Sequence, residues 1–164
     1  MTNLRLLSWN VNGLRAALKK GFIDWMIKDS PDVLCLQETK VAEDQLPEQV
    51  KSLPGYHSYF AFGPRKGRDG VALFTKNPPL AVKSSLELPG LEDESRAIVA
   101  DFGHLLLYNV YFPNDKASPE RLAYKLHFYD LFLEHIDRLS RQGKRIVVCG
   151  DLNTAHKEID LARP

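Results

Sequence analysis

The chain has 164 residues, of which 44% are hydrophobic and 26% are charged. We expect a single domain over residues 1–164, because this length suits one domain and buries a sizeable core. No stretch approaches the roughly 18 apolar residues that a membrane span requires, which excludes a membrane-embedded function. The net charge of +1 excludes a global basic field, so any DNA affinity must come from local basic patches.

The start of the chain and its cysteines bear on location. Residues 1–5 lead directly into a strand-like segment and predict no secretory signal. Cys35 and Cys149 each lie inside an apolar run, which favours buried free thiols over a disulfide or redox pair. We therefore predict a reducing, cytoplasmic setting.

The first part of the chain alternates strands and helices. Residues 4–10 are expected to form a mostly buried strand, and residues 33–37 a second one. Between them, apolar residues recur at helical spacing from Leu14 to Met26, which predicts one helix that Pro31 helps to end. A short helix is predicted near residues 45–52.

The second part begins with a run of strands. We expect them at residues 56–62, 71–75, 80–86, 97–102 and 105–112, separated by Gly, Pro and Asn. A long helix follows, with Ser118 as N-cap, Pro119 at its first position and Gly143 just past its end. Its predicted apolar face consists of Leu122, Leu126, Tyr129, Leu133 and Ile136. A last strand is expected at residues 145–149, and the order of elements indicates a mixed α/β sandwich with helices covering the sheets.

Polar side chains follow three of these apolar strands. Asn10 ends the first, Glu38 follows the second, and Asp151 with Asn153 follows the last. In α/β proteins ligands bind at the edge where strands end, so we expect these groups to converge. Carboxylate and amide oxygens are ligands for Mg²⁺ or Mn²⁺, and the scattered histidines and cysteines argue against zinc.

Taken singly, these residues have ordinary structural readings. Asn12 could cap the helix that follows it, and Glu38 could be a solvated residue at a strand end. Asp151 and Asn153 could be turn formers after Gly150. Tyr111 and Asn114 could be a sheet tyrosine and a turn asparagine. Spacing alone leaves both readings open.

Four motifs together resemble exonuclease III and its abasic-site endonuclease relatives. The first is Trp9-Asn10-Val11-Asn12-Gly13-Leu14-Arg15-Ala16, and the second is Leu36-Gln37-Glu38-Thr39-Lys40. The third is Asn109-Val110-Tyr111-Phe112-Pro113-Asn114, and the fourth runs from Gly150 to Leu161. They follow one another in the family's order along the whole chain, which makes a chance match of all four implausible.

The resemblance implies a four-layer α/β sandwich (α+β), in which two mixed sheets are flanked by helices. It also implies metal-dependent DNA hydrolysis in base excision repair, as abasic-site endonuclease and 3′-5′ exodeoxyribonuclease, with Mg²⁺ or Mn²⁺ as cofactor. Glu38 would hold the metal, with Asn10 and Asn12 in its shell. Asp151 would orient and deprotonate the attacking water, and Asn153 would fix that geometry or contact the phosphate. Tyr111 would donate a hydrogen bond to the phosphate, and Asn114 would help to hold the DNA.

Basic side chains are expected to follow the strands of a double-stranded DNA substrate with abasic sites or 3′ ends. The candidates are Arg65, Lys66, Arg68, Arg96, Lys116 and Arg121. The family often has a tyrosine where Arg68 stands here. This difference puts in question how the loop contacts DNA, but it does not affect the expected hydrolysis.

The family fold continues beyond these motifs to a Ser-Asp-His motif that this chain lacks. We therefore expect the C-terminal part of the fold to be absent, and the chain to represent a truncated or partial enzyme with poor turnover. The alternatives are a catalytically incomplete DNA-binding or partner-binding fragment, or another phosphoesterase of the same superfamily. An exposed sheet edge and an apolar patch should lead to self-association or to pairing with the missing C-terminal segment.

Overall fold

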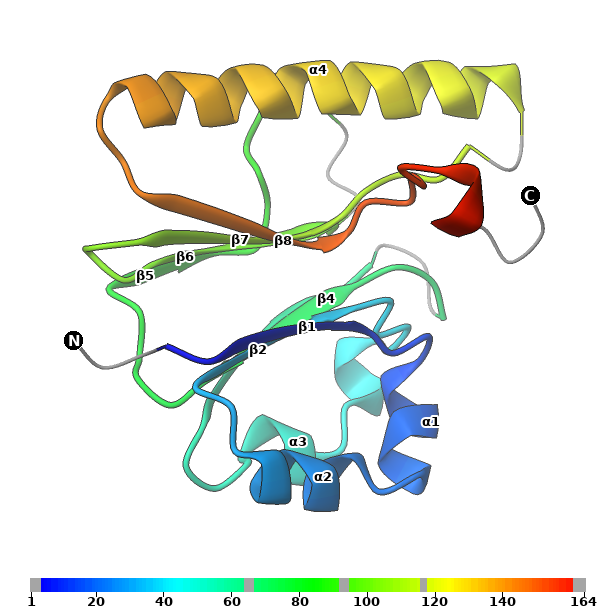
Figure 1. Cartoon of the computed structure of the whole chain (residues 1–164). Coiled ribbons are helices and arrows are strands. Elements are labelled where there is room, and N and C mark those ends of the chain that lie inside the picture. The colour runs from blue at the N-terminus through cyan, green and yellow to red at the C-terminus, as the bar shows by residue number, and fades with distance from the viewer. Residues whose placement is uncertain (1–3, 64–66, 92–94, 116–117, 161–164) are drawn as a thin grey trace.

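The protein consists of two β-sheets that face each other, with helices on the outer face of each (Figure 1). The computed structural model describes residues 4–63, 67–91, 95–115 and 118–160. Each sheet has four strands, and each combines parallel and antiparallel pairs. The predicted four-layer sandwich with two mixed sheets is confirmed. No helix in these ranges is long and apolar enough to cross a membrane.

The first sheet carries its strands in the order β1-β2-β4-β3. These strands are β1 (Leu6–Asn10), β2 (Val33–Gln37), β3 (His57–Ala61) and β4 (Val71–Thr75). β1 and β2 run parallel, whereas β4 is antiparallel to both β2 and β3. Every residue of β2 and β4 is buried, because these central strands are covered on both faces.

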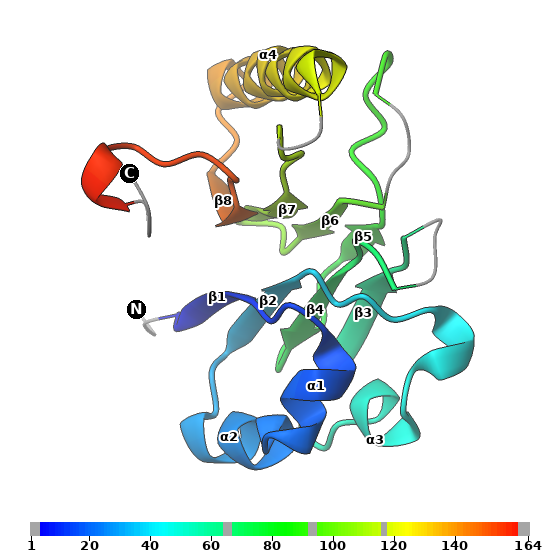
Figure 2. The same ribbon diagram turned by 90° about the vertical axis from the view of Figure 1, so that its right-hand side faces the viewer.

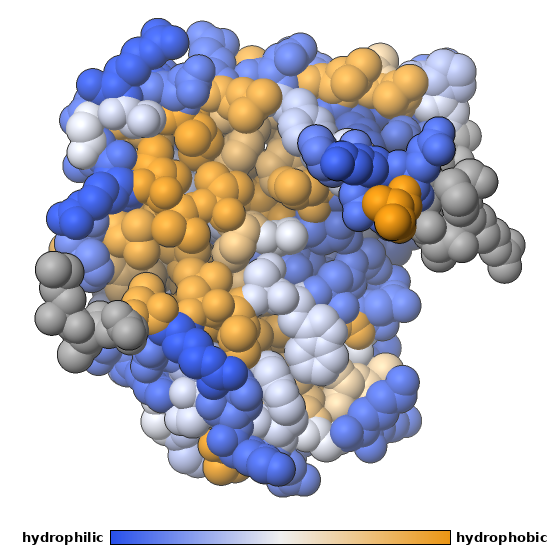
Figure 3. All heavy atoms as spheres, in the orientation of Figure 1, coloured by the Kyte–Doolittle hydropathy of each residue, from blue (hydrophilic) through white to orange (hydrophobic). Residues whose placement is uncertain are grey.

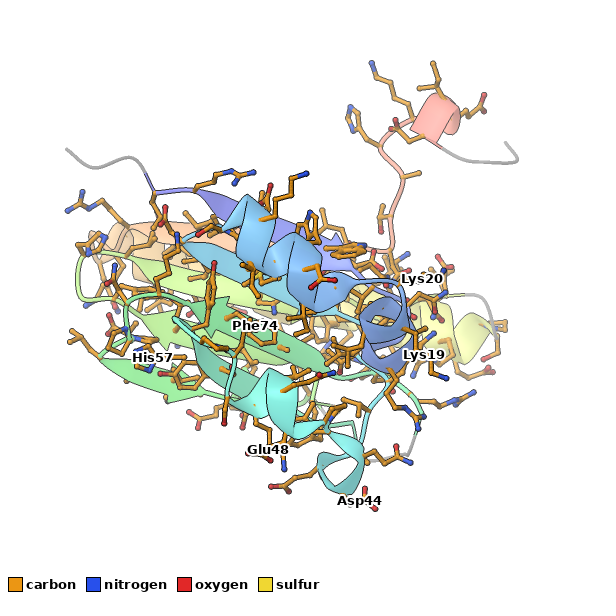
Figure 4. All side chains as sticks on the ribbon, turned by 90° about the horizontal axis from the view of Figure 1, so that it is seen from below. Lys19, Lys20, Asp44, Glu48, His57 and Phe74 are labelled. Carbon is orange, nitrogen blue, oxygen red and sulfur yellow. The ribbon has the colours of Figure 1, made fainter. Side chains whose placement is uncertain are left out.

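Helices α1 (Leu14–Lys19), α2 (Phe22–Asp29) and α3 (Glu48–Lys51) and the 3-10 turn η1 (Glu43–Gln45) cover the outer face of this sheet (Figure 4). Phe22 and Met26 of α2 belong to the same buried cluster as Phe74 of β4. The single helix predicted from Leu14 to Met26 is wrong. Gly21 adopts φ 88° and begins α2, so the apolar stripe is divided between two helices joined at a left-handed glycine.

The second sheet carries its strands in the order β5-β6-β7-β8. They are β5 (Ala81–Lys83), β6 (Ala97–Asp101), β7 (Leu106–Tyr111) and β8 (Ile146–Asp151), and only the β7–β8 pair is parallel. The long helix α4 (Pro119–Arg141) covers the outer face. The Ser118 hydroxyl accepts the Arg121 N–H, so the predicted N-cap is confirmed.

The predicted apolar face of α4 is partly wrong. Phe128 and Phe132 are buried and pack against Tyr108 and Phe112, and Tyr129 and Ile136 lie at the margin of this cluster. Leu122, Leu126 and Leu133 are 44%, 55% and 56% exposed. The aromatic residues fill the space above the sheet, and the leucines fall on the neighbouring flank of the helix. The Tyr129 hydroxyl, which donates to the Leu152 carbonyl just after β8, places that flank on the β8 side.

β1 and β8 are edge strands of their sheets. The prediction that the first strand is mostly buried is therefore wrong, and Trp9 is 41% exposed. Val147 and Val148 of β8 are exposed as well. Figure 3 shows a broad apolar face between α4 and β1, on the side where both edges are open. We call the exposed residues Leu122, Leu126, Leu133, Val147 and Val148 the open apolar face.

The cysteines Cys35 and Cys149 are both free. Cys35 is buried, whereas Cys149 on the edge strand is only partly so. The two thiols interact between the sheets. The hydrogen bond with Cys149 raises the pKa of the Cys35 thiol, and burial raises it further.

Candidate active site

The polar residues that follow the strands meet where the two sheets come together. Because β1 and β2 are parallel, Asn10 lies level with Gln37, next to Glu38. Because β7 and β8 are parallel, Tyr111 lies level with Asp151. The Asn10 Nδ2 donates to Glu38 Oε1 at 2.9 Å and to Asp151 Oδ2 at 2.7 Å. One amide group thus joins the carboxylate of the first sheet to that of the second.

A buried polar bridge behind this junction fixes the sheets against each other. The Asn109 Nδ2 on β7 donates to the carbonyl oxygens of Leu36 at 3.2 Å and Ala72 at 2.9 Å. Its Oδ1 accepts from Gln37 Nε2 at 2.8 Å, and both side chains are buried. Satisfied buried amides of this kind specify one arrangement, since a shift would leave them unpaired. The bridge therefore sets the relative position of the site residues.

The backbone at the site adopts an uncommon conformation at several positions. Asn12, Glu38, Lys40, Asp69 and Asn153 all have φ between 46° and 52°. Non-glycine residues rarely take left-handed conformations, and those that do cluster at functional sites. Here the hydrogen bonds from Gly13 N to Glu38 O and from Lys40 N to Asp69 O hold three loops against one another.

Asp151 is oriented by the loop that follows it. Its Oδ1 accepts the backbone N–H of Asn153 at 2.9 Å, and its Oδ2 accepts from Asn10. The Asn153 Nδ2 donates to the Phe112 carbonyl at 2.8 Å. Lys125 Nζ donates to the Asn153 carbonyl at 2.7 Å from α4. Asn153 therefore holds this loop in place. Fixing the geometry around Asp151 was one of its two expected roles, and contact with the phosphate was the other.

Glu38 is ionised in a partly buried setting. Burial acts to raise its pKa, but hydrogen bonds from Lys40, Asn10 and Tyr111 outweigh it and leave the pKa below the ordinary value of 4.5. Lys40 Nζ lies 2.6 Å from Glu38 Oε2 and 2.5 Å from Asn12 Oδ1. Burial and the negative charge of Glu38 raise the pKa of Tyr111 to about 12, so its hydroxyl remains a donor at neutral pH.

This set of groups fits a hard divalent cation. Glu38 and Asp151 both accept from one amide nitrogen, and neighbouring carboxylates favour a positive charge near them. The Lys40 ammonium lies between oxygens of Glu38 and Asn12, two of the side chains expected to hold the metal. The described residues contain no group of three or more His, Cys, Asp or Glu that could hold a metal by themselves. Mg²⁺ needs only one or two carboxylates, with water and phosphate completing its shell.

The predicted DNA contacts are distributed unevenly. Arg68 is exposed in the loop before β4, Asn114 follows β7, and Arg121 stacks on Tyr124 in the first turn of α4. Arg96 is buried, with 8% exposure, and so presents little of its side chain to a DNA surface. It lies under the site instead, against Tyr111. Arg65, Lys66 and Lys116 lie outside the described residues.

The site also contains residues that sequence reasoning did not assign. Lys40 is one, although it stands in the second motif. A groove beside it is lined by Gly13, Arg15, Ala16, Lys19, Lys40 and Gly67. Figure 4 shows Lys19 and its neighbour Lys20 at the end of α1, on the outer side of the molecule. The signal was the row of basic residues on one short helix next to the first motif.

Comparisons with known proteins bear on the family of this chain. The model of the Endonuclease/Exonuclease/phosphatase family matches residues 7–164. The chain is 42% identical over 164 residues to DNA repair nuclease APEX1 of Danio rerio, covering 99% of this chain and 53% of that protein. It is 38% identical to the exodeoxyribonuclease of Bacillus subtilis, covering 98% of this chain and 63% of that one.

A solved structure shares the fold as well. The 3′ phosphatase NExo from Neisseria, bound to a product DNA hairpin, matches with a TM-score of 0.80 and 28% identity, over 95% of this chain and 60% of its own. The chain therefore spans 53% to 63% of the length of these three proteins.

Proposed function

Because the chain belongs to the endonuclease/exonuclease/phosphatase family, we propose that it carries the metal site of a DNA-repair phosphodiesterase. Its reactions would be abasic-site incision and 3′-5′ exonucleolytic cleavage in base excision repair. The observation that carries the proposal is the pair of hydrogen bonds from Asn10 to Glu38 and Asp151. They join Glu38, the proposed metal ligand, to Asp151, the proposed base for the attacking water, from two different sheets.

Each site residue has a separate task in this proposal. Asp151, already oriented by Asn10 and Asn153, accepts the proton of the attacking water. Tyr111 keeps its proton and donates a hydrogen bond where negative charge develops on the phosphate. Glu38, Asn10 and Asn12 would hold Mg²⁺, or Mn²⁺ as the alternative. The bound metal supplies Lewis acidity toward the phosphate and its leaving oxygen.

The proposed substrate is double-stranded DNA with an abasic site or a 3′ end. Exposed Arg68, half-buried Arg121 and Asn114 lie in loops or turns around the site and would contact the backbone. The groove lined by Arg15, Lys19 and Lys40 adds a second basic surface next to the metal position. The names of the relatives, a DNA repair nuclease and an exodeoxyribonuclease, support DNA over a lipid or inositol phosphate. A cytoplasmic location is proposed on the two free thiols alone.

A second candidate function is favoured by the open apolar face. The edges of β1 and β8 are open on one side, and the valines and leucines beside them are exposed. Residues 154–160, which include the 3-10 turn η2 (Glu158–Asp160), are exposed and extend from the body on this side (Figure 2). We propose that the face binds the complementary C-terminal portion of the fold. Without it, the chain would act as a catalytically incomplete DNA-binding fragment.

Magnesium-dependent cleavage of a labelled abasic duplex tests these proposals, with intact duplex and inositol phosphate as competing substrates. Asp151→Asn, made in parallel, controls for contaminating nucleases. Cleavage by the chain that is lost in the variant means that the site works without further residues. If neither cleaves, the C-terminal portion of the Bacillus subtilis relative is added in trans, and restored cleavage supports an incomplete enzyme. Preference for inositol phosphate would overturn the DNA-repair proposal.

A further inference from the structure

Arg96 lies beneath the proposed catalytic tyrosine and not on the surface. Its Cζ is 5.0 Å from the centre of the Tyr111 ring. Its NH1 donates to the Tyr111 carbonyl at 3.4 Å, and the Tyr111 N–H donates to the Arg96 carbonyl at 2.7 Å. Its NH2 lies 3.2 Å from Asp69 Oδ1. The guanidinium is thus held between the face of the ring, the strand that carries it and a carboxylate from another loop.

Asp69 connects this arginine to the carboxylate of Glu38. The Asp69 carbonyl accepts the Lys40 N–H at 2.9 Å, and the Gly70 carbonyl accepts the Thr39 N–H at 3.0 Å. Lys40 in turn pairs with Glu38, and the Tyr111 hydroxyl hydrogen-bonds Glu38. These contacts close a ring from Glu38 through Lys40, Asp69, Arg96 and Tyr111 back to Glu38. The Lys40–Asp69 step is a hydrogen bond between main-chain atoms, and the other steps involve side chains.

A buried guanidinium is retained only where its charge is compensated, because its desolvation is unfavourable. Here the Asp69 carboxylate supplies the compensating charge, and the ring face supplies a cation–π contact. A guanidinium is planar and forks toward several acceptors at once, so it fixes the orientation of a stacked ring in a way that a lysine ammonium does not. The orientation of the Tyr111 hydroxyl depends on that of its ring.

We propose that Arg96, held by Asp69, is a positioning residue that fixes the Tyr111 hydroxyl toward Glu38 and the reacting phosphate, and that it does not contact DNA. This inference rests on the proposed function for its kinetic consequence. Its structural consequence, the fixed orientation of the Tyr111 ring, is independent of that function and holds whether or not the chain cleaves DNA.

The kinetic test uses Arg96→Met and Arg96→Lys in whichever form of the protein cleaves the abasic duplex. We expect kcat to fall about 10- to 100-fold, as for a reacting group that is slightly misplaced, with KM changed by less than about twofold. Arg96→Lys should recover little of the loss. The control Arg138→Met removes an exposed arginine on α4 and should leave both constants unchanged. A raised KM with unchanged kcat, and a salt dependence reduced by about one phosphate contact, would overturn the proposal in favour of DNA binding.

A double-mutant cycle separates positioning from general loss of structure. In a Tyr111→Phe background, adding Arg96→Met should lower kcat by less than about twofold, because the hydroxyl that Arg96 positions is already gone. If the full loss persists there, Arg96 acts on some other group and the proposal is wrong.

Tyrosine-labelled NMR of the chain supplies a readout that needs no activity. Arg96→Met should shift and sharpen the Tyr111 ring signal as the ring gains mobility, and Asp69→Asn should do the same more weakly. The Tyr108 ring, packed on Phe132 and His135 at the other side of the sheet, should not change and serves as the internal control. An unchanged Tyr111 signal overturns the positioning role. A wild-type chain that fails to cleave DNA in every form counts against the proposed function alone.

Discussion

Asn10 holds both carboxylates of the site on one amide nitrogen. Asn10→Asp keeps the shape of the side chain but replaces the donor with a third negative charge. Without metal we expect the variant to lose about 1–3 kcal/mol of stability, because like charges would meet in a partly buried position. Mg²⁺ should restore much of this loss, so its effect on the thermal unfolding midpoint should be larger in the variant than in the wild type.

The matched control for this measurement is Asn77→Asp, which makes the same substitution at an exposed turn position after β4. It should respond to Mg²⁺ no more than the wild type does. If Asn10→Asp and Asn77→Asp gain equally from Mg²⁺, the assignment of the metal to this junction is wrong.

Glu38 makes the stability of the folded chain depend on pH. Burial acts to raise its pKa, yet hydrogen bonds from Lys40 and Asn10 leave the folded pKa below 4.5. A group with a lowered folded pKa contributes stability above its unfolded pKa, and this contribution is lost as the pH falls through the folded pKa. Denaturant unfolding near pH 7 should therefore show Glu38→Gln to be less stable than the wild type. The difference should shrink as the pH falls below 4.5 and through the lowered folded pKa, whereas a gap independent of pH would contradict the assignment.

At this scale the sequence could predict which polar residues converge but not what each one touches. Asn10, Glu38 and Asp151 were found because each follows an apolar strand, and strand direction determines where such residues point. The contact between Arg96 and Tyr111 could not be predicted, because a basic residue at a strand start looks the same in sequence whether it faces DNA or a tyrosine. Lys40 was overlooked since its partners, Glu38 and Asn12, are set by loop conformation.

Among the elements, the β7–β8 pair depends on a single glycine. Gly150 has φ 141°, and a Cβ built there would lie 1.9 Å from the Val110 carbonyl oxygen. Gly150→Ala must displace β8 and with it Asp151, so we expect it to lose more than about 3 kcal/mol of stability. Gly143→Ala is the control, since its φ of 78° is also left-handed but nothing lies within 4 Å of the new Cβ. It should lose only about 1 kcal/mol, and equal losses in a urea titration would refute the steric argument.

The elements also show where periodicity reaches its limit. The strands at residues 33–37 and 71–75 were predicted at their observed bounds, because runs of β-branched and apolar residues between turn signals have few alternatives. The division of α1 from α2 depends on the left-handed Gly21, which a stripe of apolar residues does not reveal. The buried face of α4 was predicted incorrectly because the helix has two adjacent apolar flanks. Only the packing of Phe128 and Phe132 against the aromatic residues of and after β7 shows which flank is buried.

On the scale of the whole molecule, the open apolar face predicts association. Two open sheet edges and exposed leucines and valines form a surface that proteins normally cover. Light scattering should show a mass that rises with concentration. Leu126→Lys with Leu133→Lys should reduce this rise and change stability by less than about 1 kcal/mol, because both side chains are already exposed. Phe132→Ala, on the buried face of the same helix, should instead lose about 3–5 kcal/mol without suppressing association. A monomer at all concentrations would mean that the face needs no partner, and the case for a complementary C-terminal portion would then rest on the chain's partial coverage of its relatives alone.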